Sequence, residues 1–173
     1  MTYTRTPTLA SPVSLTDAKD HLRVMHDDED LLIQRYILAA AREIEAYCEI
    51  ALTRQTISLA VLADERQPDL VHALPIGPLA PDSNATADGA PLVNGVTGDR
   101  WPVLMLPDWM HGPVRVTYEA GFGDTPGSVP DDLQLAIMEQ AAFAYDNRGN
   151  VDVKPGLTPA AARIAARYRR VRA

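Results

Sequence analysis

The sequence predicts an α+β fold in which helices predominate: a small helical bundle, a modest antiparallel β element and an extended basic helix at the C-terminus. Residues 28–50 and 130–148 place apolar side chains three and four positions apart, the spacing of one helical face. Residues 55–62 and 113–119 alternate apolar and polar side chains, as half-buried strands do. Residues 160–173 carry five arginines and no acid, which sets the end of the chain apart.

The length of 173 residues favours one domain, which we place at residues 1–149, followed by a linker and a basic segment at 150–173. Cys48 is the only cysteine, so no internal disulfide is expected, and a reducing compartment is favoured. The start of the chain lacks the pattern of a signal peptide, and no apolar run reaches the ~20 residues of a membrane span. We therefore expect synthesis in the cytoplasm.

A first short helix is expected over about residues 15–23. Ser14 precedes it, and Asp17 follows three positions later, which is a variant of the capping box.

Four acids, Asp27, Asp28, Glu29 and Asp30, stand where the long helix over residues 28–50 should begin. A calcium loop would need alternating acids, a glycine and a distal glutamate, and this pattern is missing. Helix N-termini favour negative charge, so the acids indicate a helix start, with Asp27 or Asp28 as the N-cap. We expect neither a metal site nor acid–base catalysis here.

The middle of the chain predicts strands over about residues 55–62, 102–106 and 113–119. Residues 64–100 between them are rich in Pro, Gly, Asp and Asn, which indicates a long loop or a loosely held hairpin. Within this region we expect residues 82–99 to be mobile in the free subunit.

The segment AGFGDTPGSVP is rich in glycine but lacks the lysine and spacing of a phosphate-binding loop. It predicts a bend between a strand and a helix. Pro130 suits the first position of the helix over 130–148, and Asp131 and Asp132 suit its first turn.

No combination of residues in the sequence predicts catalysis, a cofactor or a metal site. His21 and His26 are five positions apart, which does not place them on one helical face. Cys48 lies on an apolar stripe and is expected to be buried and inert. Trp101 and Trp109 bracket a predicted strand, and both core packing and an interface role remain open.

The charge is divided unevenly along the chain. The formal net charge is −7, and the five arginines of residues 160–173 leave −12 for the preceding residues. Pro159 suits the start of a helix that would align apolar and basic stripes. The apolar stripe comprises Ile164, Tyr168 and Val171, and the basic side chains are Arg163, Arg167, Arg169, Arg170 and Arg172. A helix this short is marginal in water, so we expect a partner to order it.

Four segments, SLTDAKDHLRV, DDEDLLIQRYILAAAREIEAYCEIAL, VRVTYEAGFG and VPDDLQLAIMEQAAFAYDNRG, occur in an order that resembles a known family. The sequence is similar, over about residues 14–149, to the head–tail connector proteins (adaptor or head-completion proteins) of long-tailed double-stranded-DNA phages, prophages and gene transfer agents.

This resemblance implies a structural subunit of the particle neck and no enzymatic activity. Subunits would form a ring, a dodecamer by expectation, beneath the portal vertex. One end would hold the portal protein, the other would receive a stopper or tail-completion protein, and DNA would pass through without specific binding. The resemblance makes the C-terminal segment the portal-binding arm, with Arg163, Ile164, Arg167, Tyr168, Arg169, Arg170 and Arg172 as its contact residues. Subunit or stopper contacts are expected at Trp101, Trp109, Asn94 and Asp99.

Two other classes remain open. The arginine-rich tail alone would suit a small nucleic-acid-binding protein, although a body at −12 opposes contact with phosphates. The other class is a small hydrolase or metal enzyme that would use the acids Asp27–Asp30. The acidic body suits a connector, because DNA would slide through an acidic channel without sticking to it.

Overall fold

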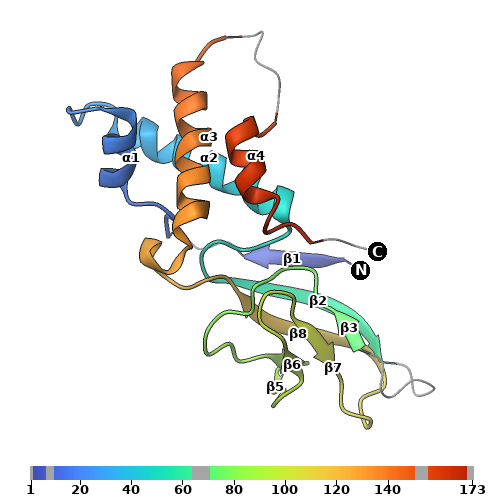
Figure 1. Ribbon diagram of the computed structural model, residues 1–173. Helices are drawn as coiled ribbons and strands as arrows, with labels where there is room; N and C mark the ends of the chain where they lie inside the picture. Colours follow the sequence, from blue (N-terminus) through green and yellow to red (C-terminus); the bar gives the residue numbers. More distant parts are fainter. Residues whose placement is uncertain (1, 7–9, 64–70, 151–155, 171–173) are drawn as a thin grey trace.

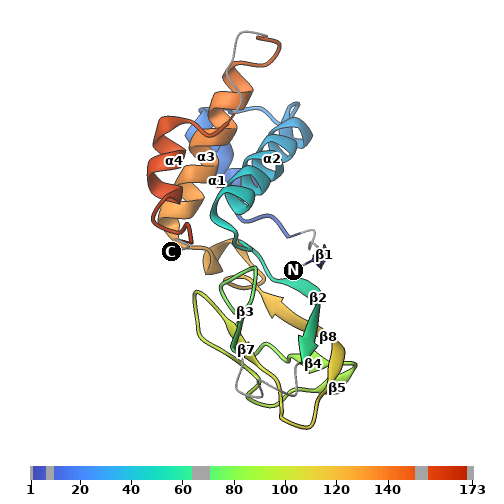
Figure 2. The same ribbon diagram turned by 90° about the vertical axis from the view of Figure 1, so that its right-hand side faces the viewer.

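The computed structural model describes residues 2–6, 10–63, 71–150 and 156–170. The helices gather in one half of the molecule and the strands in the other (Figures 1 and 2). None of the helices in these ranges is long and apolar enough to cross a membrane.

The helical half is built on a central pair of long helices. These are α2 (Asp30–Cys48) and α3 (Asp131–Asp146); α1 (Leu15–Leu22) and α4 (Pro159–Ala165) pack against both of them (Figure 1). The predicted apolar stripes form the core between the helices. Its large buried members include Ile33, Ile37, Ile44, Leu133 and Ile137. The three helices predicted before residue 149 are confirmed, with ends shifted by one or two residues.

The start of α1 confirms the predicted capping box. The Asp17 backbone N–H donates to Ser14 Oγ at 3.1 Å, and the Ser14 hydroxyl donates to Asp17 Oδ2 at 2.5 Å. The helix ends at Arg23, whose φ of 58° turns the chain toward the acidic segment.

Two antiparallel sheets form the other half. The larger has the strand order β1-β2-β8-β4-β5, from β1 (Tyr3–Thr6), β2 (Gln55–Ala63), β8 (Gly112–Ala120), β4 (Thr86–Ala87) and β5 (Ala90–Pro91). The smaller has the order β3-β7-β6, from β3 (Val71–Ala73), β7 (Val103–Met105) and β6 (Val96–Thr97). The long pair β2 and β8 buries alternate residues in register, with Ile57 opposite Tyr118 and Leu59 opposite Val116.

The α+β class is confirmed, but the β part is larger than the modest element that the sequence predicted. The additional strands are β1, with four residues, and β3 to β6, with two or three residues each, and all are too short to show a clear period of two. In the region expected to be mobile, β4 and β5 form a hairpin that is anchored by the buried side chains of Ala85, Ala87 and Leu92. The structure therefore favours the predicted hairpin over a long loop. Residues 64–70 of the predicted loop lie outside the described residues.

A buried polar cluster joins the two halves. Glu45 of α2 is only 8% exposed and accepts from the Leu52 backbone N–H and from Gln55 Nε2, both at 2.8 Å. Arg5 of β1 lies 2.8 Å from the other oxygen of Glu45 and also donates to the Ile50 carbonyl. Burial raises the pKa of Glu45, and these partners oppose that shift. The cluster thus satisfies a carboxylate that would otherwise be costly to bury.

The glycine-rich segment makes the predicted bend. It runs from the end of β8 through a short helix, η1 (Pro126–Ser128), into α3. Gly121 has a φ of +135°, and a Cβ there would lie 2.5 Å from the Thr53 carbonyl oxygen. The chain can therefore pass this close to Thr53 only with glycine.

Candidate functional site

The C-terminal segment forms the candidate site, and its first part is a helix docked on the body. Thr158 is the N-cap of α4, with its Oγ1 accepting from the Ala161 backbone N–H at 3.2 Å, and Pro159 occupies the first turn. Ala161, Ile164 and Ala165 are buried in the helical core.

This position corrects the expectation of an arm that is tethered away from its own subunit. The sequence assigned Ile164 to an apolar stripe that a partner would cover. In the structure Ile164 is 6% exposed, because α4 packs against α3 and α2 of its own chain. Apolar side chains gain free energy from any apolar surface that they can reach, and Ile164 reaches one on its own chain. Residues 151–155 of the predicted linker lie outside the described residues.

Two polar contacts hold α4 against the long helices. Gln140, buried on the inner face of α3, accepts from the Thr158 backbone N–H at 2.8 Å and donates to Glu43 Oε2 at 2.7 Å. The Cys48 thiol of α2 donates to the Ala165 carbonyl at 3.2 Å. Burial raises the pKa of Cys48 to about 11, which agrees with the predicted inert thiol.

After α4, Tyr168 fixes the chain to the start of α3. Its hydroxyl donates to Asp132 Oδ1 at 2.7 Å, and its ring meets Phe122 edge to face at a centroid distance of 6.3 Å. Burial, together with the hydrogen bond to Asp132 and its charge, raises the pKa of Tyr168 to about 12. Asp132 therefore serves as an anchor for the C-terminal segment in addition to its predicted place in the first turn of α3.

Two arginines, Arg100 and Arg170, stack on the aromatic rings of Tyr168 and Trp101. The Arg100 guanidinium lies over the Tyr168 ring at 4.8 Å and over the Trp101 ring at 5.8 Å. It also donates to the Arg167 carbonyl. The Arg170 guanidinium also lies over the Trp101 ring, 5.4 Å from its centroid, and donates to the Leu74 carbonyl at 2.8 Å. These contacts connect the basic segment to the chain that enters β7.

The segment borders a small open cleft. Arg169 lies over the Tyr47 ring at 5.3 Å, and the cleft of about 320 Å³ is lined by Ala46, Tyr47, Glu49, Arg169 and Arg170. Charged and aromatic side chains line this cleft, as they line many protein interfaces, whereas pockets for small ligands are mostly apolar.

The predicted arm residues thus divide into an inner and an outer set. Ile164 and Tyr168 face the body, and Arg170 is partly buried. Arg163, Arg167 and Arg169 are exposed, and Arg167 lies 3.8 Å from Asp132. Arg172 and Val171 lie outside the described residues.

The four residues expected at subunit or stopper contacts are not brought together in one site. Trp101 is partly buried and packs against the helical core, and two guanidinium groups lie over its ring. Its contact with a neighbouring protein stays a prediction. Trp109 is 70% exposed, which keeps the interface interpretation open for it. Asn94 has a φ of 57° in a turn, and the Asp99 carbonyl accepts from the Leu79 backbone N–H.

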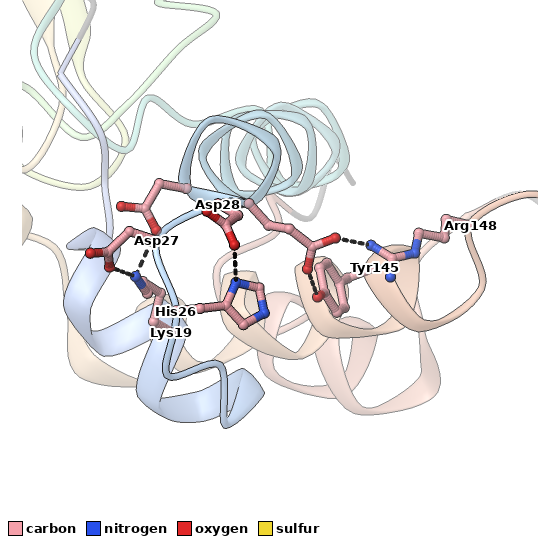
Figure 3. A network of polar contacts seen from close by, with 8 residues as sticks. Lys19, His26, Asp27, Asp28, Tyr145 and Arg148 are labelled. Carbon is pink, nitrogen blue, oxygen red and sulfur yellow. Dashed lines mark hydrogen bonds and ion pairs between the residues drawn. The ribbon is translucent and has the colours of Figure 1, made fainter.

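The acidic segment forms a polar network at the junction of three helices (Figure 3). Lys19 of α1 donates to Asp27 at 2.5 Å and to Asp30 at 2.7 Å. Glu29 accepts from Arg148 at 2.8 Å and from the Tyr145 hydroxyl, and these two hydrogen bonds lower the pKa of Glu29.

A helix start at this segment is confirmed, since α2 begins at Asp30. The prediction of Asp27 or Asp28 as N-cap is wrong: Glu29 occupies that position, and its side chain makes no capping hydrogen bond. The Glu29 carboxylate instead accepts from Tyr145 of α3 and from Arg148 just beyond the end of α3, and the bond from Arg148 is charge-assisted. Within the described ranges, no group of three or more His, Cys, Asp or Glu side chains could hold a metal ion.

Sequence reasoning missed Arg100, Gln140 and the anchoring role of Asp132. A buried glutamine within the apolar stripe of residues 133–141 was the one available signal, since such a side chain needs hydrogen-bond partners from another segment. Arg100 lies in a region without periodicity, and no local pattern marks it.

Comparison with known proteins gives two kinds of relatives. Residues 12–74 match the family described as phage gp6-like head-tail connector protein. Among solved structures, the fold is similar to a chain in the neck of an empty gene transfer agent particle computed with C6 symmetry. That pair has a TM-score of 0.77 and 28% identity, over 100% of this chain and 97% of the other.

Two further structures agree. A chain in the virion of a native gene transfer agent particle has a TM-score of 0.76, and a chain in the native neck computed with C12 symmetry has 0.73. Both are 26% identical and cover 100% of this chain and 97% of the other. Among curated proteins, none matches the sequence. The resemblance to head–tail connector proteins is confirmed, and these relatives are particle components and not enzymes, as predicted.

Proposed function

We propose that this chain, which is related through residues 12–74 to the phage gp6-like head–tail connector proteins, is a structural subunit of the neck of a phage-like particle. The observation that carries the proposal is the fold similarity to a gene transfer agent neck chain along the whole length of both proteins. A match that extends through the basic C-terminal segment supports the same role for the entire chain.

In this proposal the subunits form a closed ring beneath the portal, with DNA passing through its centre. Neck structures computed with C6 and with C12 symmetry both suit a dodecamer, because twelve-fold symmetry contains six-fold symmetry. The −12 charge of the body before residue 160 suits a channel that must not retain phosphates.

The C-terminal segment is the proposed contact with the portal protein. Its exposed guanidinium groups, Arg163, Arg167 and Arg169, would make charge-assisted hydrogen bonds to carboxylates of that partner. Ile164 and Tyr168 have a different task, because they hold the segment on the body and set where the arginines point. The β half, which carries the exposed Trp109, is the proposed side for the stopper or tail-completion protein.

Replacing Arg163, Arg167 and Arg169 together by glutamate tests the portal contact. The variant should fold like the wild type, because all three side chains are exposed. It should fail to bind isolated portal rings and leave filled heads without tails. A matched control reverses one exposed arginine of the β half, Arg115→Glu. Wild-type binding by the triple variant would contradict the assignment.

The nucleic-acid alternative makes a different prediction. If the tail were a phosphate-binding arm, affinity for random DNA would fall steeply with salt and depend on the same arginines. We expect no DNA binding at physiological ionic strength, since two of the tail arginines already lie over aromatic rings of the protein.

A further inference from the structure

We propose that the outer faces of α2 and α3 form the two sides of the contact between neighbouring copies in the ring. This inference rests on the ring of the proposed function and adds the surfaces by which it closes. A cyclic ring joins subunits head to tail, so it requires two different faces on each copy that fit one another.

The outer face of α2 is apolar and basic. Leu31 and Leu38 are 73% and 37% exposed, and Arg35 and Arg42 are exposed beside them. These four residues follow one another at spacings of four and three, so they share one stripe of the helix. The stripe is opposite the buried face that includes Ile37.

The outer face of α3 is apolar and acidic. Leu135 and Phe143 are 41% and 36% exposed, and the acids around them are Asp131, Glu139 and Asp146. Leu135, Glu139 and Phe143 are spaced by four residues, again along one side of a helix.

The two faces point away from each other within one subunit. α2 and α3 pack together through their buried faces (Figure 2), so their outer faces lie on opposite sides of the pair. The side chains named above are exposed except for Glu139, which is partly exposed and lies 3.9 Å from Nε2 of His21 on α1. The first helix therefore borders the outer face of α3 without covering Leu135 or Phe143. The molecule therefore presents a stripe with two arginines on one side and a stripe with acids on the other.

The spacings also agree. Leu31 and Leu38, Arg35 and Arg42, and Glu139 and Asp146 are each separated by seven residues, which is about 10 Å along a helix. Two helices of this kind can set leucine against leucine or phenylalanine while the guanidinium groups meet carboxylates. Two exposed charges nearby are already engaged within the subunit: Glu43 accepts a hydrogen bond from Gln140, and Arg148 is paired with Glu29.

Charge reversal with complementation tests the contact. One variant carries Arg35→Glu and Arg42→Glu, and the other carries Glu139→Lys and Asp146→Lys. Each is supplied alone to particles produced without this protein, and its content in purified particles is measured. Like charges that face each other across an interface strongly oppose association. Particles supplied with either variant alone should therefore contain at least roughly tenfold less of it than of the wild type. Thermal unfolding of each purified variant checks that it is folded.

Supplying both variants together should restore incorporation. In a mixed ring the acidic α2 of one variant meets the basic α3 of the other, and the remaining contacts keep the wild-type pairing. Alternation closes any ring with an even number of copies. A single chain with all four changes should also be incorporated. The control is Arg23→Glu with Asp20→Lys, two exposed charges at the end of α1 that the proposal assigns to no contact, and it should behave as the wild type.

The possible results distinguish a wrong subunit contact from a wrong function. Absence of the wild-type protein from the neck would overturn the proposed function itself. If the wild type is present and the single-face variants are incorporated equally well, the contact is wrong. Loss with each variant and no rescue by the mixture would also overturn it, since the faces would then meet a different protein, such as the portal.

Discussion

Tyr168 donates its hydroxyl hydrogen to Asp132 across 2.7 Å, which joins the basic C-terminal segment to the first turn of α3. Residues 36 positions apart thus meet at the base of the helical half. The contact shows that the C-terminal segment belongs to the folded body up to this residue, and it makes the stability of the body depend on a segment that we also assign to a partner.

The first prediction concerns Ile164. Replacement by alanine should lower the free energy of unfolding by about 2–4 kcal/mol, because a nearly buried side chain leaves a cavity between α4 and the long helices. Denaturant unfolding measures this. Arg163→Ala, next to it and exposed, should change stability by less than about 0.5 kcal/mol. Equal, small effects would mean that α4 is not docked in solution. By the same reasoning, deleting residues 157–173 should destabilise the body.

A second prediction uses the raised pKa of Tyr168. Its folded pKa of about 12 exceeds the ordinary value of 10, so the folded protein keeps a proton that the unfolded chain releases. The resulting stability is fully present below pH 10 and is lost as pH rises toward 12. Tyr168→Phe should reduce the alkaline loss of melting temperature. The difference between the two proteins is the measurement, because Cys48 and Tyr118 also have raised pKa values. Parallel curves for both proteins from pH 9 to 11.5 would refute it.

The acid side tests Glu29. Hydrogen bonds from Tyr145 and Arg148 lower its pKa, so its contribution to stability is present at neutral pH. That contribution disappears as pH falls through the folded pKa, below the ordinary value of 4.5. In Glu29→Gln the melting temperature should be lower at pH 7 and fall less toward pH 3. Asp28→Asn provides the control, since Asp28 is exposed and only approaches His26, at 4.0 Å.

A fourth prediction concerns the guanidinium between two rings. Arg100→Ala removes contacts to Trp101, Tyr168 and the Arg167 carbonyl. Each cation–π contact at an exposed place contributes ~0.5–1 kcal/mol, so the segment should open more often without global unfolding. Trypsin cleaves after arginine, and cleavage at Arg167, Arg169 and Arg170 should become faster. Arg54→Ala, whose partners lie elsewhere, controls for general loosening. Unchanged cleavage in Arg100→Ala would show that these contacts do not hold the segment.

The long elements could be predicted from sequence because each carries its own signal. The stripes of α2 and α3 and the alternation of β2 and β8 repeat over many residues, and Ser14 with Asp17 marks a helix start locally. The two-residue strands β4, β5 and β6 exist only because neighbouring strands order them, so no local pattern identifies them.

The candidate site was only partly predictable for a related reason. The arginines were evident from composition, but their surroundings depend on residues far away in sequence. Nothing near residue 164 indicates that α2 and α3 leave room for its side chain, and nothing near residue 100 indicates a meeting with Tyr168. Likewise, the partners of Glu29 lie more than 100 positions later, so no local pattern shows that this acid at the start of a helix also joins α2 to the end of α3.

We propose above all that this protein connects head and tail in a phage-like particle. Electron microscopy of particles assembled without it tests that claim most directly. We predict DNA-filled heads with portals and without attached tails, and tails should attach once the purified wild-type protein is added. The Arg163, Arg167 and Arg169 triple variant should fail to restore them. Normal numbers of tailed particles in the absence of this protein would contradict the claim.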